Sequence, residues 1–311
     1  MYMKDSKFTT TFGKEIAIYT IEPKIPAIAS INIFHGASEH ALRYREAAEA
    51  LAEKGFYVVM HDHLGHGHTK DVNKDVVIFD TQNGAQKLLD TCYEVYQYTH
   101  KAHPELPHFA IAHSMGSLII RALNHQHNHL FDGIVYIGSP IVPSFKLRAV
   151  RFLAKIVKRL KGDLHVSRLI TNLTQNQAFE SMRKRGLIEH RYEWATSNVE
   201  VQNQSRKDPL IGLPFTISAQ VDLFTIILMA HQSSAISNHA QLHYILCGDE
   251  DALCNYGESA QRLSELYLQQ GYTNVRHKVY PNARHELLNE PIKKTVLDDI
   301  IEHLMVIIKS S

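Results

Sequence analysis

The sequence predicts an α/β fold in which a mostly parallel sheet is covered by helices on both faces. Short apolar runs without a helical period alternate with helix-length segments over 27–140, and again from residue 242 to the end. This alternation is typical of parallel sheets. The segment 140–213 is mostly helical in pattern and has no clear strand. We therefore expect a core of 1–139 and 214–311, into which 140–213 is inserted as a helical cap.

The strands are predicted from apolar runs that end at turn-forming residues. The first two are expected to form a hairpin, with arms at 7–11 and 15–21 around Gly13. The run 107–112 is followed directly by a helical pattern from Ser117. Further strands are expected at 27–34, 56–60, 133–138, 242–247 and 275–279.

Outside the predicted cap, three further helices are located by their start and stop signals. A helix over 43–54 ends at a glycine, and a long helix over 81–103 is closed by Pro104. The C-terminal helix is expected over 290–308, with Pro291 in its first turn, where a backbone N–H is not needed.

The composition is that of a globular protein, and its small net charge gives it no strong electrostatic field. The chain has 311 residues, of which 44% are hydrophobic and 21% charged, and its formal net charge is +1. So small a net charge argues against nucleic acid as a partner. Cys92, Cys247 and Cys254 are too few and too irregular for a disulfide framework. The polar N-terminus does not predict a signal peptide, and no apolar run could span a bilayer, so we expect a cytoplasmic protein.

The segment Ala112-His113-Ser114-Met115-Gly116 lies between a predicted strand and a predicted helix. A serine on so sharp a turn is exposed for reaction, and the residues two before and two after it must be small because the two backbones nearly touch. Ala112 and Gly116 meet that requirement, although glycine is more common at the first position. The pattern predicts Ser114 as a nucleophile, and it leaves open a chance serine on a tight turn. We expect His113 to pack or hydrogen bond beside it.

A nucleophilic serine needs a general base, and the base needs an acid that orients it. In sheet hydrolases these residues follow the serine in the order acid, then histidine, each after a different strand. Here the predicted strand 242–247 leads into three acids, Asp249, Glu250 and Asp251, and the next strand leads towards His285. The order fits a catalytic triad, but spacing alone does not decide among the three acids.

The negative charge that develops on a carbonyl oxygen needs two preorganised N–H donors. The amide of Met115, directly after the nucleophile at a helix N-terminus, is one candidate. The other is expected in the loop His35-Gly36-Ala37, which follows an early strand. Gly36 allows this backbone to turn inward, so the Ala37 amide is the predicted second donor.

Together these segments resemble the monoacylglycerol lipase and lysophospholipase branch of the α/β-hydrolases, which is similar to the serine aminopeptidase S33 group. The resemblance covers the core on both sides of the predicted cap. Several motifs in the family's order are far more specific than any one of them. The matching segments are His35-Gly36-Ala37-Ser38-Glu39-His40, Arg43-Tyr44, Asp62-His63-Leu64-Gly65-His66-Gly67-His68-Thr69, Ala112-His113-Ser114-Met115-Gly116, Asp208-Pro209-Leu210, Gly248-Asp249-Glu250-Asp251 and His285-Glu286-Leu287-Leu288-Asn289-Glu290.

The resemblance implies the α/β-hydrolase fold, with a mostly parallel eight-stranded sheet and an inserted helical cap. It implies Asp251 as the catalytic acid, since the family's pattern places its acid there. Gly36, Glu39 and Arg43 are implied to lie near the polar end of the substrate. Leu288 stands where some lipases carry a further histidine, and this departure bears on head-group recognition.

The implied reaction is hydrolysis of carboxylic esters of lipids, with lysophospholipids or monoacylglycerols as substrates. His285 takes the proton of Ser114, which attacks the ester carbonyl, and the oxyanion is bound by the amides of Ala37 and Met115. Asp251 stays ionised and holds the histidine tautomer, and water releases the fatty acid from the acyl-enzyme. No metal or organic cofactor is implied.

Two other functions remain open on the sequence. Peptide hydrolysis of the proline iminopeptidase type would need a cap acid aimed at a free amine, and Glu193 or Glu200 could serve. A hydrolase-like binding protein without turnover would be expected to lack a member of the triad, whereas Ser114, Asp251 and His285 are all present.

Four closely spaced histidines suggest a metal site as a further alternative, since imidazole is a common metal ligand. They are His61, His63, His66 and His68. The segment is better explained as the family's glycine-rich loop beside the active site, so we expect no metal ligands there.

The cap helix predicted over 144–161 is basic and amphipathic. Its cations, with no acid among them, are Lys146, Arg148, Arg151, Lys155, Lys158, Arg159 and Lys161. Its apolar positions include Leu147, Val150, Leu153, Val157 and Leu160. Such a helix could contact the anionic inner face of a membrane transiently, or could pack on its neighbour with a solvated basic face.

Trp194, also in the cap, could line an acyl tunnel or belong to the core.

Overall fold

The centre of the fold is one eight-stranded sheet. The computed structural model describes residues 3–71, 74–127, 130–232 and 238–310. Within them the strands are β1 (Met3–Thr9), β2 (Glu15–Ile21), β3 (Ala29–Phe34), β4 (Phe56–His61), β5 (His108–His113), β6 (Gly133–Ile137), β7 (Leu242–Gly248) and β8 (Val275–Tyr280). Their order across the sheet is β1-β2-β4-β3-β5-β6-β7-β8.

The sheet is mostly parallel, as the sequence predicts. β2 pairs antiparallel with both β1 and β4, and every other pairing is parallel, so β2 alone among these strands runs against the rest. The central strands β3, β4, β5, β6 and β7 are buried along their whole length. Burial on both faces explains why their sequences are largely continuous apolar runs rather than alternating ones.

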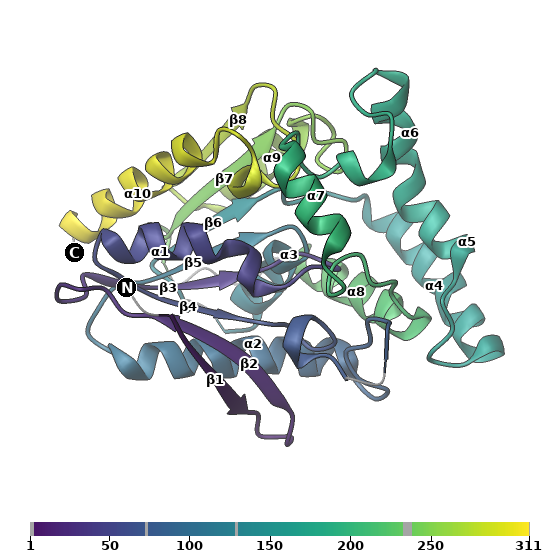
Figure 1. Ribbon diagram of the computed structural model, residues 1–311, viewed down its shortest axis with the longest axis horizontal. Helices are drawn as coiled ribbons and strands as arrows, with labels where there is room; N and C mark the ends of the chain where they lie inside the picture. The colour runs from purple at the N-terminus through teal and green to yellow at the C-terminus, as the bar shows by residue number, and fades with distance from the viewer. Residues whose placement is uncertain (1–2, 72–73, 128–129, 233–237, 311) are drawn as a thin grey trace.

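Helices cover both faces of the sheet (Figure 1). They are α1 (Arg45–Glu53), α2 (Gly84–Ala102), α3 (Met115–Gln126), α8 (Ile217–Ala230), α9 (Glu258–Gln270) and α10 (Lys293–Ser310). α1 and α10 cover one face, where Leu51 and Ile300 belong to a buried cluster. The other four cover the opposite face, where Leu88 and Ile119 belong to a second cluster. The protein thus has one apolar core on each side of the sheet.

The segment 140–213 is helical throughout its regular structure, and none of its residues is in a strand. Its elements are α4 (Ser144–Lys161), α5 (Arg168–Thr171), the π-helical turn η3 (Asn172–Asn176), α6 (Gln177–Lys184), the 3₁₀ turn η4 (Arg191–Glu193) and α7 (Val199–Lys207). α4, α5 and α6 stand to one side of the sheet, at the right of Figure 1. α4 packs along α8, to which Arg151 and Lys158 hydrogen bond at Thr225 and Ser218. Among the described residues, no helix has the length and apolar character needed to cross a bilayer.

The N-terminal hairpin is longer than its sequence suggests. Its first arm is Met3–Thr9 rather than 7–11, and residues 10–14 form the turn. Gly13 takes the left-handed conformation, with φ +81°, which a residue with a Cβ adopts only with strain. Polar residues at the start of this strand are exposed, so hydropathy gave no signal for them.

Some helix boundaries also differ. The helix predicted over 43–54 begins with a 3₁₀ turn, η1 (Ala41–Tyr44), before α1. Similar turns are η2 (Gly67–Thr69) and η5 (Leu287–Asn289), and α10 starts after the second of these. The sequence did not predict α8, because a helix that is buried on several sides is apolar all round and lacks the amphipathic period.

Candidate active site

The predicted catalytic residues come from loops at one edge of the sheet. Because β3, β5, β7 and β8 run parallel, their carboxyl ends lie at the same edge. His35 follows β3, Ser114 follows β5, Asp251 lies three residues after β7, and His285 lies five residues after β8. Open parallel sheets bind their ligands at this edge.

Ser114 lies at the turn between β5 and α3, in a backbone conformation that residues with a Cβ rarely adopt. Its φ is 48° and its ψ is −113°, and its amide donates to the carbonyl of Ile137 at 2.9 Å. A Cβ on Gly116 would lie 2.4 Å from the carbonyl oxygen of Phe34 and 2.8 Å from that of His35. The turn therefore packs directly against the end of β3, and this packing maintains the strained backbone that places the half-buried serine at the edge of the sheet.

His285 and Asp251 form a buried pair. The Nδ1–H of His285 donates to Asp251 Oδ2 at 2.7 Å, and the exposed fractions of the two residues are 2% and 1%. The other carboxylate oxygen accepts the amides of Leu253 and Cys254. His285 Nε2 has no hydrogen-bond partner among the described residues. One imidazole nitrogen is therefore fixed by an acid, and the other is free to take a proton.

The electrostatics of this pair favour its charged forms. Burial alone would lower the pKa of His285, but the facing Asp251 carboxylate outweighs it and raises that pKa above 6.5. Burial would also raise the pKa of Asp251, but the imidazole and the amide of Cys254 hold it below its ordinary value. Asp251 is therefore ionised at neutral pH and stabilises the imidazolium that forms when His285 takes a proton.

Two backbone amides flank the serine in the manner required of an oxyanion site. Met115 is the first residue of α3, and Ala37 lies in the loop after β3, against which the α3 turn packs. Neither amide hydrogen bonds to any part of the chain that the structure describes. The next amide, that of Ser38, donates instead to His66 Nε2 at 3.1 Å. Two free N–H groups at this position can bind a developing negative charge.

Glu39 and Arg43 lie in a buried network beside the serine. Arg43 Nη1 donates to Glu39 at 2.6 Å and to Glu286 at 2.7 Å. Glu39 also accepts the amide of Gly36 and the hydroxyl of Tyr44. The side chains of Arg43, Glu39 and Glu286 are exposed by only 9%, 4% and 9%. The structure thus pairs both residues with protein groups, and their contact with substrate stays a prediction.

His113 joins this network to His285, the predicted catalytic histidine. Its Nδ1 lies 2.8 Å from Glu39 Oε1, and its Nε2 lies 3.3 Å from the backbone carbonyl of His285. Both partners are acceptors, so the ring of His113 links the Glu39 carboxylate to the backbone of the loop that carries His285. The motif around Ser114 showed that position 113 would be close, but not which acid it would contact.

The segment 140–213, predicted as a cap, contacts the loop that carries His285. The ring of Trp194 lies 4.9 Å from that of His285, measured between centroids. Arg284 donates to the carbonyls of Leu187 and Glu193 at 2.5 and 2.7 Å. The sequence indicated neither contact, because residues 187–194 are brought to this loop only by the tertiary fold.

The glycine-rich loop is held by its own polar groups. His66 Nδ1 donates to the carbonyl of Leu64, and its Nε2 accepts the amide of Ser38, so both nitrogens are engaged. The carboxylate of Asp62 accepts the amide of His68 at 2.8 Å. These contacts account for the spacing of the loop without a metal at His66.

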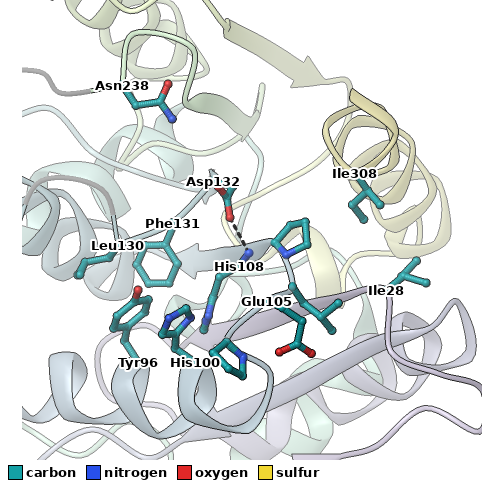
Figure 2. Close-up of a pocket in the computed structure, with 13 residues that line it drawn as sticks. Ile28, Tyr96, His100, Glu105, His108, Leu130, Phe131, Asp132, Asn238 and Ile308 are labelled. Atoms are coloured by element: carbon teal, nitrogen blue, oxygen red, sulfur yellow. Dashed lines mark hydrogen bonds between the residues drawn. The ribbon is translucent and has the colours of Figure 1, made fainter. Parts of the chain in front are cut away.

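A cavity of about 730 Å³ lies at the opposite edge of the sheet (Figure 2). It is lined by Ile28, Tyr96 and Phe131, and by His108, whose amide donates to Asp132. Ile28, Phe131 and His108 precede or begin their strands, and Tyr96 lies on α2, whereas the predicted triad residues follow their strands. None of the triad residues lines this cavity.

The sheet order, the helices on both faces and the serine at the turn after β5 define the class of protein as an α/β-hydrolase. A thermostable carboxyl esterase from Bacillus coagulans superposes with a TM-score of 0.83, at 22% identity over 99% of each chain. A soluble variant of monoglyceride lipase from Saccharomyces cerevisiae, in complex with a substrate analog, superposes with a TM-score of 0.71, at 16% identity over 97% of this chain and 94% of that one. These similarities confirm the predicted fold.

Sequence comparison gives the family. The chain matches the family described as serine aminopeptidase, S33, over residues 26–292, and it belongs to that family. It is 27% identical to the monoglyceride lipase of Rattus norvegicus over 275 residues, which cover 84% of this chain and 80% of the relative. It is 25% identical to the monoacylglycerol lipase of Mycolicibacterium smegmatis over 316 residues, 96% and 98% of the two chains. The predicted enzyme class, a carboxylic ester hydrolase, is confirmed.

Proposed function

We propose that this chain hydrolyses esters of lipids that carry a single acyl chain, monoacylglycerols or lysophospholipids, through Ser114, His285 and Asp251. The observation that carries the proposal is the 2.7 Å pair of His285 and Asp251, with His285 Nε2 unpartnered among the described residues. The similarity to monoglyceride lipases of two organisms supports the class of substrate.

In the proposed reaction, His285 Nε2 removes the proton of Ser114 as the serine oxygen attacks the ester carbonyl. The amides of Ala37 and Met115 stabilise the oxyanion. His285 then donates its proton to the leaving alcohol, and an acyl-enzyme remains. Water, activated by the same imidazole, releases the fatty acid, while Asp251 stays ionised and stabilises the imidazolium.

The proposed cap, residues 140–213, would supply the wall against which the acyl chain lies. Trp194 is half-buried, and its ring lies 5.6 Å from that of Phe179 as well as beside His285. Such aromatic surface next to the catalytic base favours an apolar substrate group over a charged one.

The helix α4 is the proposed point of contact with an anionic membrane surface. Its apolar residues form two faces. Leu147 is buried, and Val150, Leu153 and Val157 pack against the core. The other face is an exposed stripe of Phe145, Phe152, Ile156 and Leu160, with exposed fractions of 71%, 67%, 41% and 75%. An exposed apolar stripe flanked by cations fits a helix that lies in a membrane interface.

The peptidase alternative gains no support from the two cap acids. The carboxylate of Glu193 accepts the amides of Glu189 and His190, so it is engaged within its own turn. Glu200 is exposed at the start of α7. Neither has the buried, unpaired carboxylate expected of a site for a free amine.

The substitution Ser114→Ala tests the proposal. We expect hydrolysis of a p-nitrophenyl ester and of monoacylglycerol to fall by about 10⁶-fold in kcat, because the nucleophile is lost. Circular dichroism and the melting temperature should be retained. A fluorophosphonate should label the wild type and the control Ser117→Ala, but not Ser114→Ala. Retained ester hydrolysis or labelling in Ser114→Ala would show that the serine is wrongly assigned.

A substrate panel tests the finer claim. Monoacylglycerols and lysophospholipids should be hydrolysed at higher kcat/KM than prolyl or aminoacyl anilides. The opposite ranking would favour the peptidase alternative while leaving the triad intact.

A further inference from the structure

Three side chains that bind soft metals meet in the core behind the oxyanion loop. His61 ends β4, His63 follows it, and Cys92 lies on α2. Cys92 Sγ lies 3.7 Å from His61 Nε2 and 3.6 Å from His63 Nδ1. All three side chains are 0% exposed. None of them takes part in the proposed ester hydrolysis, so their grouping needs a separate explanation.

A hydrogen bond determines the tautomer of His63, so that the ring nitrogen facing the Cys92 sulfur carries no proton. The Nε2 of His63 lies 3.2 Å from the backbone carbonyl of His35, which can only accept, so Nε2 carries the hydrogen. Nδ1 therefore presents its lone pair to Cys92. A backbone carbonyl behind the distal nitrogen is the usual arrangement of a histidine that binds a metal, because it sets the tautomer and the ring orientation.

The thiol of Cys92 can donate to only one of the two imidazoles, and its sulfur is a weak acceptor for the other. It has one proton, and both His61 Nε2 and His63 Nδ1 face it. His61 Nδ1 has no hydrogen-bond partner among the described residues, so nothing else fixes that ring. An ion at the centre of the three atoms would accept all three lone pairs. With metal–nitrogen and metal–sulfur bonds of about 2.0 and 2.3 Å, nitrogen and sulfur lie about 3.6 Å apart, which is the separation found.

We propose that His61, His63 and Cys92 form a binding site for monovalent copper. A thiolate and two neutral imidazoles carry one negative charge, and Cu(I) neutralises it, as a fully buried site requires. Thiolate and imidazole are also the soft ligands that suit this ion. The group whose ligand atoms lie within 4.8 Å of one another contains three residues, whereas Zn²⁺ in structural sites takes four ligands.

The nearest acid in the sequence does not complete a site for a divalent ion. The carboxylate of Asp62 accepts the hydroxyl of Tyr19 at 3.0 Å and the amides of Ala41 and His68, both at 2.8 Å. Asp62 also does not belong to the group of described residues whose ligand atoms lie within 4.8 Å of one another. The charge of the site is therefore that of the thiolate.

Bound copper would connect α2 to the loop that carries the proposed oxyanion donor. The amide of His63 donates to His35 Nε2 at 2.9 Å, and the His63 ring donates to the carbonyl of the same residue. His35 directly precedes Gly36 and Ala37. An ion that fixes His63 to Cys92 thus stabilises the folded state at the base of this loop.

The test loads the full-length protein with Cu(I) under reducing, oxygen-free conditions against a chromogenic Cu(I) chelator. Because the site is closed to solvent, protein from copper-supplemented cells is analysed in parallel. We expect one Cu(I) per chain, an X-ray absorption spectrum with one sulfur and two nitrogen neighbours, and a higher melting temperature. Cys92→Ala and Cys92→Ser should lose the ion and the thermal shift. Cys247→Ala, which removes a buried thiol outside the site, should retain both.

Three results would overturn the proposal: no copper retained by either loading route, equal retention after Cys92 is replaced, or a spectrum with sulfur neighbours only. The spectrum of the wild type decides the matter even if both Cys92 variants fail to fold. Zinc retained in place of copper, at one ion per chain, would also contradict the choice of a monovalent ion.

Discussion

Arg43 donates through both of its terminal nitrogens to the carboxylate of Glu286, at 2.7 and 2.6 Å. Glu286 directly follows the catalytic histidine proposed here, and the same guanidinium donates to Glu39, which in turn accepts the amide of Gly36. One cation therefore joins the loop after β3 to the loop after β8. Its burial and pairing favour a positioning role, which maintains the distance between the proposed oxyanion donor and the general base.

We expect Arg43→Met to destabilise the protein by about 3–5 kcal/mol, because it leaves two buried carboxylates without their cation. Activity at temperatures below unfolding should fall mainly in kcat, since the two loops lose their common anchor. Chemical denaturation and steady-state kinetics measure both effects. The control is Arg45→Met, which removes an exposed i,i+4 pair with Glu49 and should change little. Equal effects of the two substitutions would contradict the positioning role.

The pH dependence of kcat/KM should show an acid limb set by His285. A general base must be unprotonated, and the Asp251 carboxylate raises the pKa of His285 above 6.5. Activity should therefore be lost as the pH falls through a value above 6.5, and should be retained above it.

Asp251→Asn should shift that limb to lower pH. Burial lowers the pKa of His285, and the substitution removes the Asp251 charge that chiefly opposes burial, leaving only the smaller upward effects of Glu286 and Glu39. At the same time kcat should fall by about 10⁴-fold, because the tautomer is no longer fixed. The test compares kcat/KM of the wild type and of Asp251→Asn between about pH 5 and 9, a range that spans the ordinary histidine pKa. An unchanged or upward-shifted limb would mean that Asp251 is not the partner of the base.

The turn around Ser114 gives a matched pair of substitutions. Gly116→Ala places a Cβ 2.4 Å from the carbonyl oxygen of Phe34, so the end of β3 must move. We expect a loss of about 1–3 kcal/mol in stability and a larger loss of kcat, since the Met115 amide is displaced with it. Ala112→Gly places the residue that is more common at this position in a buried strand. It should lower the free energy of unfolding by only about 0.5–1 kcal/mol, with kcat nearly unchanged. Reversal of this order in melting and rate measurements would show that the contact with β3 is not critical.

The extent to which these features could be predicted depends on how local they are. The triad order was accessible because Ser114, Asp251 and His285 each follow a predicted strand; the strands before Ser114 and Asp251 are apolar runs, whereas the one before His285 is Val-Arg-His-Lys-Val-Tyr. The parallel sheet was predicted for the same reason, and both the fold and the enzyme class are confirmed. The roles of the three residues stay predictions, since the structure gives their geometry and not their activity.

Contacts between distant segments could not be predicted. Arg43 and Glu286 are 243 positions apart, and His63 and Cys92 are 29 apart, so no periodicity relates them. Such pairs depend on which helix packs against which strand end. The sequence also did not reveal the exposed apolar stripe of α4. Leu160 shares helical spacing with residues of the packed face, so the spacing of apolar residues did not separate the two faces.

The stripe on α4 leads to a prediction about membranes. Phe152 is 67% exposed on the side of the helix away from the core, and the cations of α4 have no acid beside them in the helix. Phe152→Asp should therefore reduce co-sedimentation with anionic vesicles by removing apolar contact and adding a like charge to the lipid. Hydrolysis of a soluble p-nitrophenyl ester should be unchanged, because the residue does not contribute to the proposed triad.

The matched control is Leu268→Asp, which changes an exposed apolar residue of α9, on a different part of the fold, with an exposed fraction of 51%. If α4 is the docking helix, this variant should sediment as the wild type does. High salt should weaken binding of the wild type, since cation–lipid attraction is screened, but should not abolish it, because the apolar stripe contributes independently of salt. Equal partitioning of the wild type to neutral and anionic vesicles at low salt, or equal loss in both variants, would contradict a specific role for α4. In that case the stripe would be an exposed cap surface without a lipid partner.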